Sequence, residues 1–364
     1  RDGCFTGSAV IKDDKMYLLY TGHVNQESGY IETQNLAVSK DGIHFEKYDG
    51  NPVIKNPPAD TTMRFRDPKI WEKNGNYYAV IGGETEDKCG KVVYYRSRDL
   101  QEYTYCGVFA DCPNFVQIGN TDVLIISPKG LEKENGFSAS FESGYMTGKM
   151  NYEEGMFSHA SYKKLDHGFD FYAPQVMECG DRKILFAWFA IPDSPGKEME
   201  DGWRHLLTIP RELKVASDNS LLMTPIEELK KLRTKVLEKT VPGASWNCNI
   251  ENQPLELLLT GRYEELCFEI ADKNEPLLEF TLKKDNIVLK QKREDGWQIR
   301  TCSYYDDIMR KMQIYMDYST IEVFINDGRY VFSSRIYPVG SLDFRINAAA
   351  DNEDGSLKIY SLSL

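Results

Sequence analysis

Two short segments place an acidic side chain where it could do chemistry. The first is Arg66-Asp67-Pro68, which puts a carboxylate next to a guanidinium and fixes the backbone with the proline. The second places Asp111 before Cys112 and a proline. Each segment taken alone is more typical of a turn or a strand entry than of a catalytic site.

A third segment, from Leu165 to Gln175, is much denser in functional groups. It holds two carboxylates, one histidine and three aromatic side chains directly before an expected strand. A loop this rich in polar and aromatic groups is costly to keep for packing alone, so the pattern favours a site. We interpret His167 as a hydrogen-bonding loop residue rather than a metal ligand.

The elements around these segments in the first half of the chain are short strands paired around turns. Aromatic or β-branched runs flank Gly, Asn or Asp turns, which is typical of hairpins. The expected pairs are 9–11 with 16–20, 70–71 with 77–81, 115–118 with 123–126, and 175–177 with 184–189. Repeated antiparallel sheets of this kind favour a β-propeller over a sandwich.

The second half of the chain begins with an expected helix. Thr224 is the expected N-cap, Pro225 the first helical residue, and the apolar face ends before Lys235. The helix would link two β domains. Short strands follow at 255–259, 266–270, 277–282, 287–289, 312–316, 321–325 and 330–333. Their close spacing predicts a β-sandwich.

Composition excludes several classes of protein. The chain has 364 residues, 44 Lys and Arg against 56 Asp and Glu, and a net charge of −12. This balance argues against nucleic acid or an anionic membrane as the main partner, and no apolar run is long enough to span a bilayer. The eight cysteines lack metal-site spacing, so we expect reduced and mostly buried thiols.

The motifs of the chain, taken in order, resemble glycoside hydrolase family 32, and within it the bacterial sucrose-6-phosphate hydrolases and sucrases. The motifs are Cys4-Phe5-Thr6-Gly7-Ser8-Ala9-Val10, Arg66-Asp67-Pro68, Cys112-Pro113-Asn114-Phe115, the run 165–175, Asp201-Gly202-Trp203, Ile209-Pro210-Arg211-Glu212-Leu213, and the stretch 314–328. The resemblance covers essentially the whole chain.

The resemblance implies an all-β fold, a five-bladed β-propeller followed by a C-terminal β-sandwich. We expect a propeller domain at 1–214, a linker with a short helix at 215–240, and a sandwich at 241–364. The family's segment before the position of Cys4 has no counterpart in these residues. We therefore expect that the start of the first blade is missing, and that the ring is completed by upstream residues, closes differently, or is completed in a homo-oligomer.

The activity that the resemblance implies is retaining hydrolysis of a β-fructofuranosyl bond, as in sucrose or sucrose-6-phosphate, by two carboxylates and a third that assists. Asp67 matches the assisting carboxylate, which stabilises the transition state. Asp111 stands at the acid/base position, where the family has Glu. The family's nucleophile belongs to an Asn-Asp-Pro-Asn-Gly motif that does not occur in these residues.

The resemblance also implies a set of substrate-binding residues. They are Phe5, Thr6, Ser8, Arg66, Cys112, Asp170, Tyr172, Gln175 and Trp188. The expected partner is a small sugar: sucrose, its 6-phosphate or a short fructan. Neither a cofactor nor a metal is expected, and reduced cysteines favour the cytoplasm.

Two other hypotheses compete with an active fructofuranosidase. The first is a catalytically degenerate relative that binds a fructosyl sugar without cleaving it, because the nucleophile motif is absent and Asp111 replaces Glu. The second is a truncated chain that retains only the fold. The ordered motifs place hydrolysis first.

Overall fold

The computed structural model describes residues 2–108, 114–128, 141–192, 194, 196–240, 245–273, 275–349 and 355–363. The chain divides into two compact units. Unit 1 consists of Arg1–Lys133 and Ser138–Lys163, and unit 2 consists of Glu134–Phe137 and Lys164–Leu364. Each unit is described by itself.

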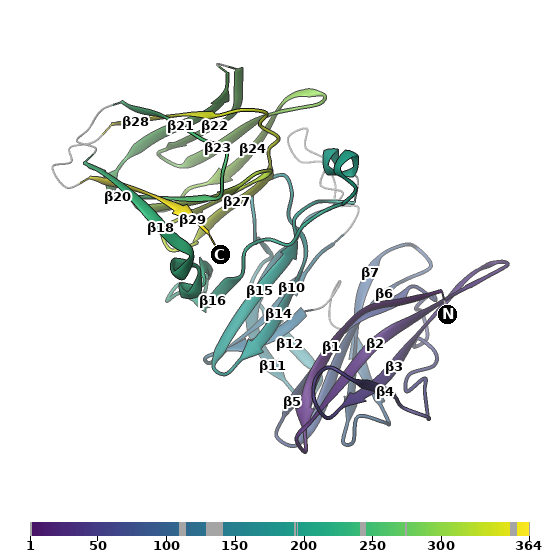
Figure 1. Cartoon of the computed structure of the whole chain (residues 1–364). Coiled ribbons are helices and arrows are strands. Elements are labelled where there is room, and N and C mark those ends of the chain that lie inside the picture. Colours follow the sequence, from purple (N-terminus) through teal and green to yellow (C-terminus); the bar gives the residue numbers. More distant parts are fainter. Residues whose placement is uncertain are drawn as a thin grey trace. The chain divides into compact units, whose positions relative to one another are not determined.

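Unit 1 contains three antiparallel sheets whose strands follow one another along the chain (Figure 1). The first sheet contains β1 (Gly3–Lys12), β2 (Lys15–Gln26), β3 (Gly29–Ser39) and β4 (Phe45–Lys47). The second contains β5 (Phe65–Lys73), β6 (Asn76–Glu84), β7 (Gly90–Ser97) and β8 (Thr104–Val108). The third contains β9 (Asn114–Ile118), β10 (Thr121–Ile126), β11 (Gly144–Asn151) and β12 (Met156–His159), and β13 (Lys163–Lys164) also pairs with β11.

The hairpins form where the turn residues predict them. Between β1 and β2 the turn residues Asp13 and Asp14 have φ of 48° and 56°, and between β5 and β6 Asn74 and Gly75 have φ of 52° and 73°. Two consecutive positive φ angles give a two-residue turn whose twist matches that of the flanking strands. Asp, Asn and Gly accept this conformation at low cost. The expected strand pairs of both hairpins are confirmed.

Unit 2 begins with one further sheet of the same kind and continues as a sandwich of two six-stranded sheets. The first sheet contains β14 (Tyr172–Cys179), β15 (Arg182–Trp188), β16 (Arg211–Val215) and β17 (Leu221–Pro225). One sandwich sheet has the order β18 (Arg233–Thr240), β29 (Ser356–Leu362), β20 (Leu255–Tyr263), β25 (Met309–Asp317), β26 (Thr320–Ile325) and β27 (Tyr330–Arg335). The other has the order β19 (Trp246–Ile250), β28 (Leu342–Ala349), β21 (Glu265–Asp272), β22 (Glu275–Lys283), β23 (Asn286–Arg293) and β24 (Gly296–Ser303).

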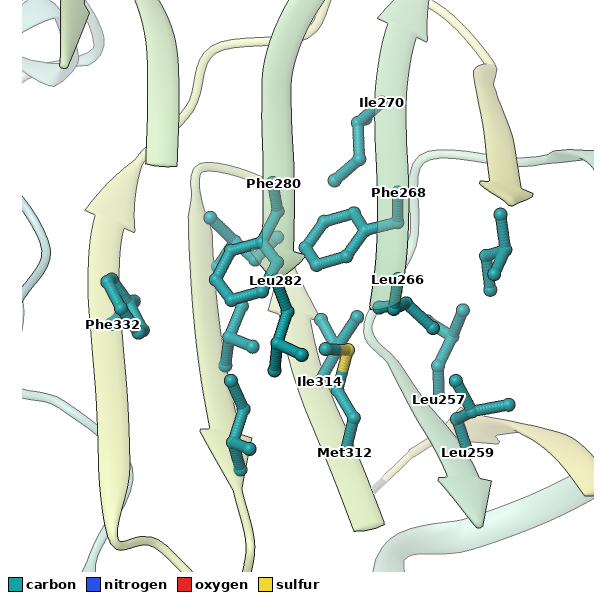
Figure 2. Packing of buried hydrophobic residues seen from close by; sticks show 14 of the residues in the cluster. Leu257, Leu259, Leu266, Phe268, Ile270, Phe280, Leu282, Met312, Ile314 and Phe332 are labelled. Carbon is teal, nitrogen blue, oxygen red and sulfur yellow. The ribbon is translucent and has the colours of Figure 1, made fainter. Parts of the chain in front are cut away.

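The sandwich is held together by an apolar core between its sheets (Figure 2). Phe268 and Phe280 stack within one sheet at 4.9 Å between ring centroids, and Phe280 meets Phe332 of the other sheet edge-on at 5.2 Å. These rings are at most 1% exposed. Burying one such side chain contributes about 1.5–3 kcal/mol, so the alternating pattern of these strands fixes which face turns inward.

Two sequence expectations are wrong in detail. The expected helix is a 3-10 helix of six residues, Glu227–Leu232, and its expected cap Thr224 lies in β17 instead. The strand pairing of Thr224 and Pro225 with β16 overrides the local capping signal. The thiols are not mostly buried, because among the seven cysteines that the structure describes only Cys302 is buried. All seven are free of disulfides.

Over the described residues the fold consists of strands and two short 3-10 helices, Lys197–Asp201 and Glu227–Leu232, and the strands predicted for the sandwich are confirmed. The boundaries proposed for the propeller, the linker and the sandwich stay predictions. Among the residues described, no helix has the length and apolar character needed to cross a membrane.

Candidate active site

Asp67 sits at an irregularity in β5, where the pairing with β6 shifts between Arg66 and Lys69. Its φ is 62°, a left-handed conformation that costs energy for most residues and that Asp and Asn tolerate better than others. A bulge of this kind re-aims a side chain out of the regular alternation of a strand. The local strain therefore directs one carboxylate away from the sheet ladder, which is common at functional sites.

The surroundings of Asp67 shift the pKa of its carboxyl group in both directions. Burial raises the pKa of the Asp67 carboxyl, while Arg66 and a hydrogen bond with the Thr6 side chain lower it and Glu32 raises it. The backbone N–H of Asp67 donates to Thr21 Oγ1 at 3.1 Å. The carboxylate is thus partly withdrawn from water but kept beside a cation, as expected for a group that must meet developing positive charge.

Arg66 is held by a carboxylate that the sequence analysis did not single out. Glu32 in β3 is fully buried, accepts a hydrogen bond from Arg66 Nε at Oε2, and forms an ion pair with Arg66 Nη2 at Oε1, both at 3.0 Å. Its oxygens also meet the backbone N–H of Phe65 at 2.9 Å and His23 Nδ1 at 3.1 Å. Such a two-point contact fixes the orientation of the guanidinium as well as its position.

Aromatic rings surround the same guanidinium. Arg66 lies over the rings of Phe5 and Tyr30 at 5.7 and 5.8 Å. Phe5 also stacks on His23, with 4.5 Å between centroids and 18° between planes. Phe5 is 36% exposed, so it offers a flat apolar face to solvent while its other contacts hold it in place.

Further polar side chains tie β1, β2 and β3 to β5. Thr21 Oγ1 donates to Gln34 Oε1 at 2.9 Å, and Gln34 Nε2 donates to the carbonyl of Phe65 at 2.8 Å. Ser8 Oγ donates to the carbonyl of Pro68 and accepts from the N–H of Ile70, both at 2.8 Å. The predicted substrate residue Ser8 thus holds the backbone of the residues that follow Asp67, from Pro68 to Ile70.

Sequence reasoning missed Glu32 and Gln34 because acidic and amide residues are abundant in this chain. A weak signal existed, since Glu32, Gln34 and Leu36 are spaced two residues apart and therefore share one face of the strand. A polar residue in phase with a buried Leu lies on the buried face and needs a partner.

In unit 2 the predicted residues Tyr172 and Trp188 lie opposite each other. They pair across β14 and β15, and their ring centroids are 6.4 Å apart. His205 meets Trp188 edge-on at 4.9 Å. Beyond Tyr172 the backbone turns through Ala173, whose φ is 48°, and the pairing shifts before Gln175, which is exposed. We call Tyr172, Trp188 and His205 the aromatic triad.

His205 is kept neutral by its surroundings. Burial lowers the pKa of His205, and the adjacent Arg204 lowers it further, although Glu198 opposes this. Arg204 Nε donates to His205 Nε2 at 3.0 Å, so the lone pair of that nitrogen is used by a guanidinium. A neutral ring can stack and donate through its other nitrogen.

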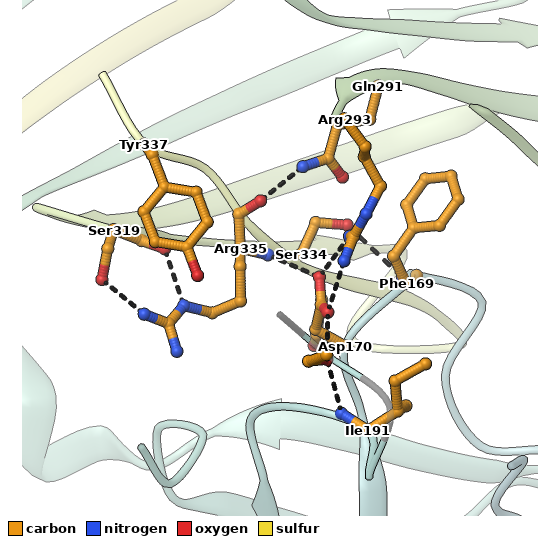
Figure 3. A network of polar contacts seen from close by, with 12 residues as sticks. Phe169, Asp170, Ile191, Gln291, Arg293, Ser319, Ser334, Arg335 and Tyr337 are labelled. Atoms are coloured by element: carbon orange, nitrogen blue, oxygen red, sulfur yellow. Dashed lines mark hydrogen bonds and ion pairs between the residues drawn. The ribbon is translucent and has the colours of Figure 1, made fainter. Parts of the chain in front are cut away.

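Asp170, another predicted substrate residue, is fully buried (Figure 3). Its carboxylate accepts two hydrogen bonds from Arg293, at 2.7 and 3.1 Å, and one from the backbone N–H of Arg335 at 2.8 Å. Ser194 Oγ approaches it at 3.4 Å. The oxygens are therefore occupied by protein groups.

Two predicted residues, Asp111 and Cys112, lie outside the residues that the structure describes. Asp67, Arg66, Phe5, Thr6 and Ser8 come together in unit 1, whereas Asp170, Tyr172, Gln175 and Trp188 belong to unit 2. Across the described ranges no group of three His, Cys, Asp or Glu residues could hold a metal ion.

Comparison with known proteins identifies the family. The family model described as "Glycosyl hydrolases family 32 N-terminal domain" matches residues 1–225, and "Glycosyl hydrolases family 32 C terminal" matches residues 280–363. The chain belongs to glycoside hydrolase family 32. This confirms the family inferred from the motifs, and with it the fold class of a β-propeller followed by a β-sandwich.

Several relatives are similar over nearly the whole chain. The sucrose-6-phosphate hydrolase of Bacillus subtilis (strain 168) is 36% identical over 363 residues, which cover 93% of this chain and 74% of the relative. A β-fructofuranosidase of Bombyx mori has a similar structure, with a TM-score of 0.87, 30% identity and coverage of 99% of this chain and 79% of that one. A variant of the Bombyx mori enzyme in complex with sucrose gives a TM-score of 0.85 at 29% identity, with the same coverage of both chains.

Proposed function

We propose that this protein is a β-fructofuranosidase that hydrolyses the fructosyl bond of sucrose or sucrose-6-phosphate. The relatives with the highest similarity reported above carry these activities in their names, and one structural relative binds sucrose. The observation that carries the proposal is the placement of Asp67. It stands in a strained bulge, beside a guanidinium fixed by a buried carboxylate, in a chain that belongs to the family.

In the proposed reaction Asp67 stabilises the transition state. As the bond between the fructosyl carbon and the leaving oxygen breaks, positive charge develops on the ring. A carboxylate already oriented by Thr6 and Arg66 can hold sugar hydroxyls and favour that charge without reorganising. Phe5 would supply an apolar face to the sugar ring.

The remaining roles in the reaction are assigned by family position. Asp111 is proposed as the acid that protonates the leaving oxygen, and Cys112 is proposed as a substrate-binding residue beside it. No nucleophile is assigned within these residues. Tyr172, Gln175 and Trp188 are proposed to bind substrate, and His205 packs edge-on against Trp188.

The site of action is proposed to be the cytoplasm. The seven cysteines that the structure describes are all free thiols, and Cys4, Cys89 and Cys179 are exposed. Free and exposed thiols persist in a reducing compartment. A sugar phosphate substrate would also be found there, because phosphorylated sugars do not cross membranes unaided.

The proposal is tested by product analysis with purified protein. We expect release of fructose from sucrose and sucrose-6-phosphate, with glucose or glucose-6-phosphate as the second product, and none from maltose, which has no fructosyl bond. NMR of the first product formed should show the β anomer of fructose, because a retaining mechanism conserves the configuration. Sugar binding without any product would contradict hydrolysis and support the degenerate relative instead.

A further inference from the structure

The segment that precedes Tyr172 is hydrogen-bonded to the sandwich through its backbone. The N–H groups of His167 and Phe169 donate to the carbonyls of Val331 and Ser333, at 2.8 and 2.9 Å. These acceptors belong to β27, the edge strand of its sheet. Gly168 has no room for a Cβ, which would collide with the backbone of Ser333. The segment therefore covers a sheet edge that would otherwise expose unpaired backbone groups.

Two carboxylates complete this pairing from the side of the segment. The N–H of Ser333 donates to Asp166 Oδ1 at 2.9 Å. The N–H of Arg335 donates to Asp170 Oδ2 at 2.8 Å (Figure 3). Arg293 of β23 adds two parallel hydrogen bonds to Asp170. The density of polar groups in this segment is thus explained largely by docking onto the sandwich.

Phe169 anchors the same segment in the sandwich interior. It is 3% exposed and belongs to the sandwich core. The guanidinium groups of Arg293 and Arg300 lie over its ring, at 5.3 and 4.6 Å. Arg293 therefore contacts two successive residues of the segment, the ring of one and the carboxylate of the next.

The sandwich also holds the second segment that supports the aromatic triad. The side chain of Arg335 reaches Glu198 Oε1 at 3.2 Å, and Tyr337 donates to Glu198 Oε2 at 2.8 Å. Glu198 in turn accepts the N–H of His205 at 3.1 Å. Arg335 thus binds one segment through its backbone and the other through its side chain.

A shared hydroxyl joins the two segments. Ser194 Oγ lies 3.4 Å from Asp170 Oδ1 and accepts the N–H of Ile191 at 3.0 Å. The carboxylate of Asp170 is therefore connected both to the segment that leads to Tyr172 and to the segment between Trp188 and His205. Tyr172 follows it by two residues, and Ile191 follows Trp188 by three.

We propose that Arg293 and Asp170 are positioning residues, through which the sandwich sets the geometry of the aromatic triad for sugar binding. This inference rests on the proposed function, since it takes the triad as a sugar-contacting surface. Neither residue needs to touch the substrate. A surface that binds sugar works best when its rings are held in place before the sugar arrives, so a rigid support for the triad has a functional value.

The chain offers a matched control for this proposal. Arg233 and Glu256 form a second buried two-point ion pair, with Nε to Oε2 at 2.7 Å and Nη2 to Oε1 at 2.6 Å. The side-chain exposures are 18% and 0%, against 17% and 0% for Arg293 and Asp170. The control pair joins strands β18 and β20 and touches neither segment. Its loss should reduce stability without moving the triad.

The experiment compares Arg293→Met with Arg233→Met in the full chain. Hydrogen exchange is followed in peptides that cover residues 165–176 and 191–208. The values of kcat and KM are measured with sucrose. Calorimetric titration of sucrose gives a second measure of binding. We expect Arg293→Met to speed exchange in both peptides at least tenfold more than the control does. Its KM should rise about tenfold with kcat within about threefold of the wild type, the pattern of lost substrate binding.

A second variant guards against a failure to fold. Arg293→Lys keeps the charge but cannot make two parallel hydrogen bonds, so it should fold and give an intermediate rise in exchange and KM. Asp170→Asn, which keeps the shape, should behave like Arg293→Lys.

The outcomes separate this inference from the proposed function. Unchanged exchange in both peptides, relative to the control, overturns the inference while leaving hydrolysis intact. Faster exchange with an unchanged KM and unchanged sucrose binding also overturns the inference, because the contacts of Arg293 and Asp170 would then have no effect on sugar binding. A wild type that neither binds nor cleaves any fructosyl sugar overturns the proposed function, and exchange alone then decides whether Arg293 holds the segment.

Discussion

At the scale of single residues, Glu32 fixes the position and orientation of Arg66 in the Arg66-Asp67 motif. It is the buried partner of Arg66 and also accepts the N–H of Phe65, so it fixes the backbone and the side chain at the entrance to the bulge. A guanidinium held in this way acts on Asp67 from a constant direction. The motif therefore depends on a residue more than thirty positions upstream.

Glu32→Gln should impair both stability and catalysis. The change keeps the shape but leaves Arg66 without its counter-charge, and we expect a loss of about 1–3 kcal/mol because Arg66 is still partly solvated. The value of kcat/KM should fall at least tenfold. Denaturant unfolding and kinetics with sucrose measure the two effects.

The control for Glu32 is Glu84→Gln. Glu84 pairs with Arg64, two residues before Arg66, but both side chains are more exposed, at 26% and 41%. A more exposed pair contributes less than about 1 kcal/mol. If both variants behave alike, the special role of Glu32 is refuted.

His167 provides a second test at this scale, through pH. Burial lowers the pKa of His167 to about 4, although Asp166 opposes this, and the unfolded chain has a value near 6.5. Between these values the unfolded state binds the proton more tightly, so the group costs stability as pH falls below about 6.5. His167→Gln should remove this dependence.

The measurement is the free energy of unfolding at pH 7 and at pH 5. The wild type should lose about 2 kcal/mol more than His167→Gln over this interval. Comparison with the variant cancels other groups that titrate in the window, including His205. An identical pH dependence of the two proteins would show that His167 titrates normally.

At the scale of elements, β16 is joined to the sandwich by a buried charge cluster. Arg211 is fully buried and contacts Asp166 at 3.0 Å, Glu322 at 2.6 Å and Ser333 Oγ at 2.6 Å. Its guanidinium also lies over the Phe171 ring at 4.9 Å. Three of the family motifs, those with Asp166, Arg211 and Glu322, thus meet at a structural junction within unit 2.

Arg211→Met should destabilise the protein strongly. It leaves two carboxylates in a buried place without a counter-charge, and burial already raises the pKa of Glu322 despite the presence of Arg211. Breaking a buried pair costs about 3–5 kcal/mol. Urea unfolding followed by circular dichroism gives the difference.

Arg345→Met is the matched comparison on the sandwich surface. Arg345 pairs with Glu269 at 2.9 Å, with exposures of 45% and 26%, and its loss should cost less than about 1 kcal/mol. An Arg211→Met protein as stable as Arg345→Met would mean that the buried cluster is not a net structural support.

Strands were predicted correctly where they flank turns with a clear sequence signal. The hairpins around Asp13 and Gly75 follow from local chemistry and were correct. Strand β18 was missed, because its sequence shows no apolar alternation and it is stabilised by pairing with β29 near the other end of the chain. The capping pattern at Thr224 was misleading for the same reason, since strand pairing outweighed it.

The candidate site was predictable where a motif is local. Asp67 and Arg66 stand in one tripeptide, whereas Glu32 is a lone carboxylate whose partner lies on another strand. The dense run 165–175 predicted a site, and this stays a prediction, because its polar groups are largely engaged in docking onto the sandwich. Its docking onto β27 could not be foreseen, because the contact between Asp170 and Arg335 spans 165 residues of sequence.

At the scale of the whole molecule, each unit holds some of the residues that the family resemblance predicts for the site. Unit 1 supplies Asp67 with its support, and unit 2 supplies the aromatic triad mounted on the sandwich. The net charge of −12 does not favour a phosphorylated sugar, so a basic contact for sucrose-6-phosphate must be local. Comparing kcat/KM for the two substrates would show whether such a contact exists.

The most direct test of the central claim is hydrolysis of sucrose and sucrose-6-phosphate by the wild type and by Asp67→Asn. Asn accepts the positive φ of this position, and because burial raises the pKa of Asp67, removing the charge should not lower stability at neutral pH. We predict fructose release by the wild type and a fall of about 10²–10³ in kcat/KM for the variant, with unfolding unchanged. Equal rates for the two proteins, or no fructose release by the wild type, would contradict the account.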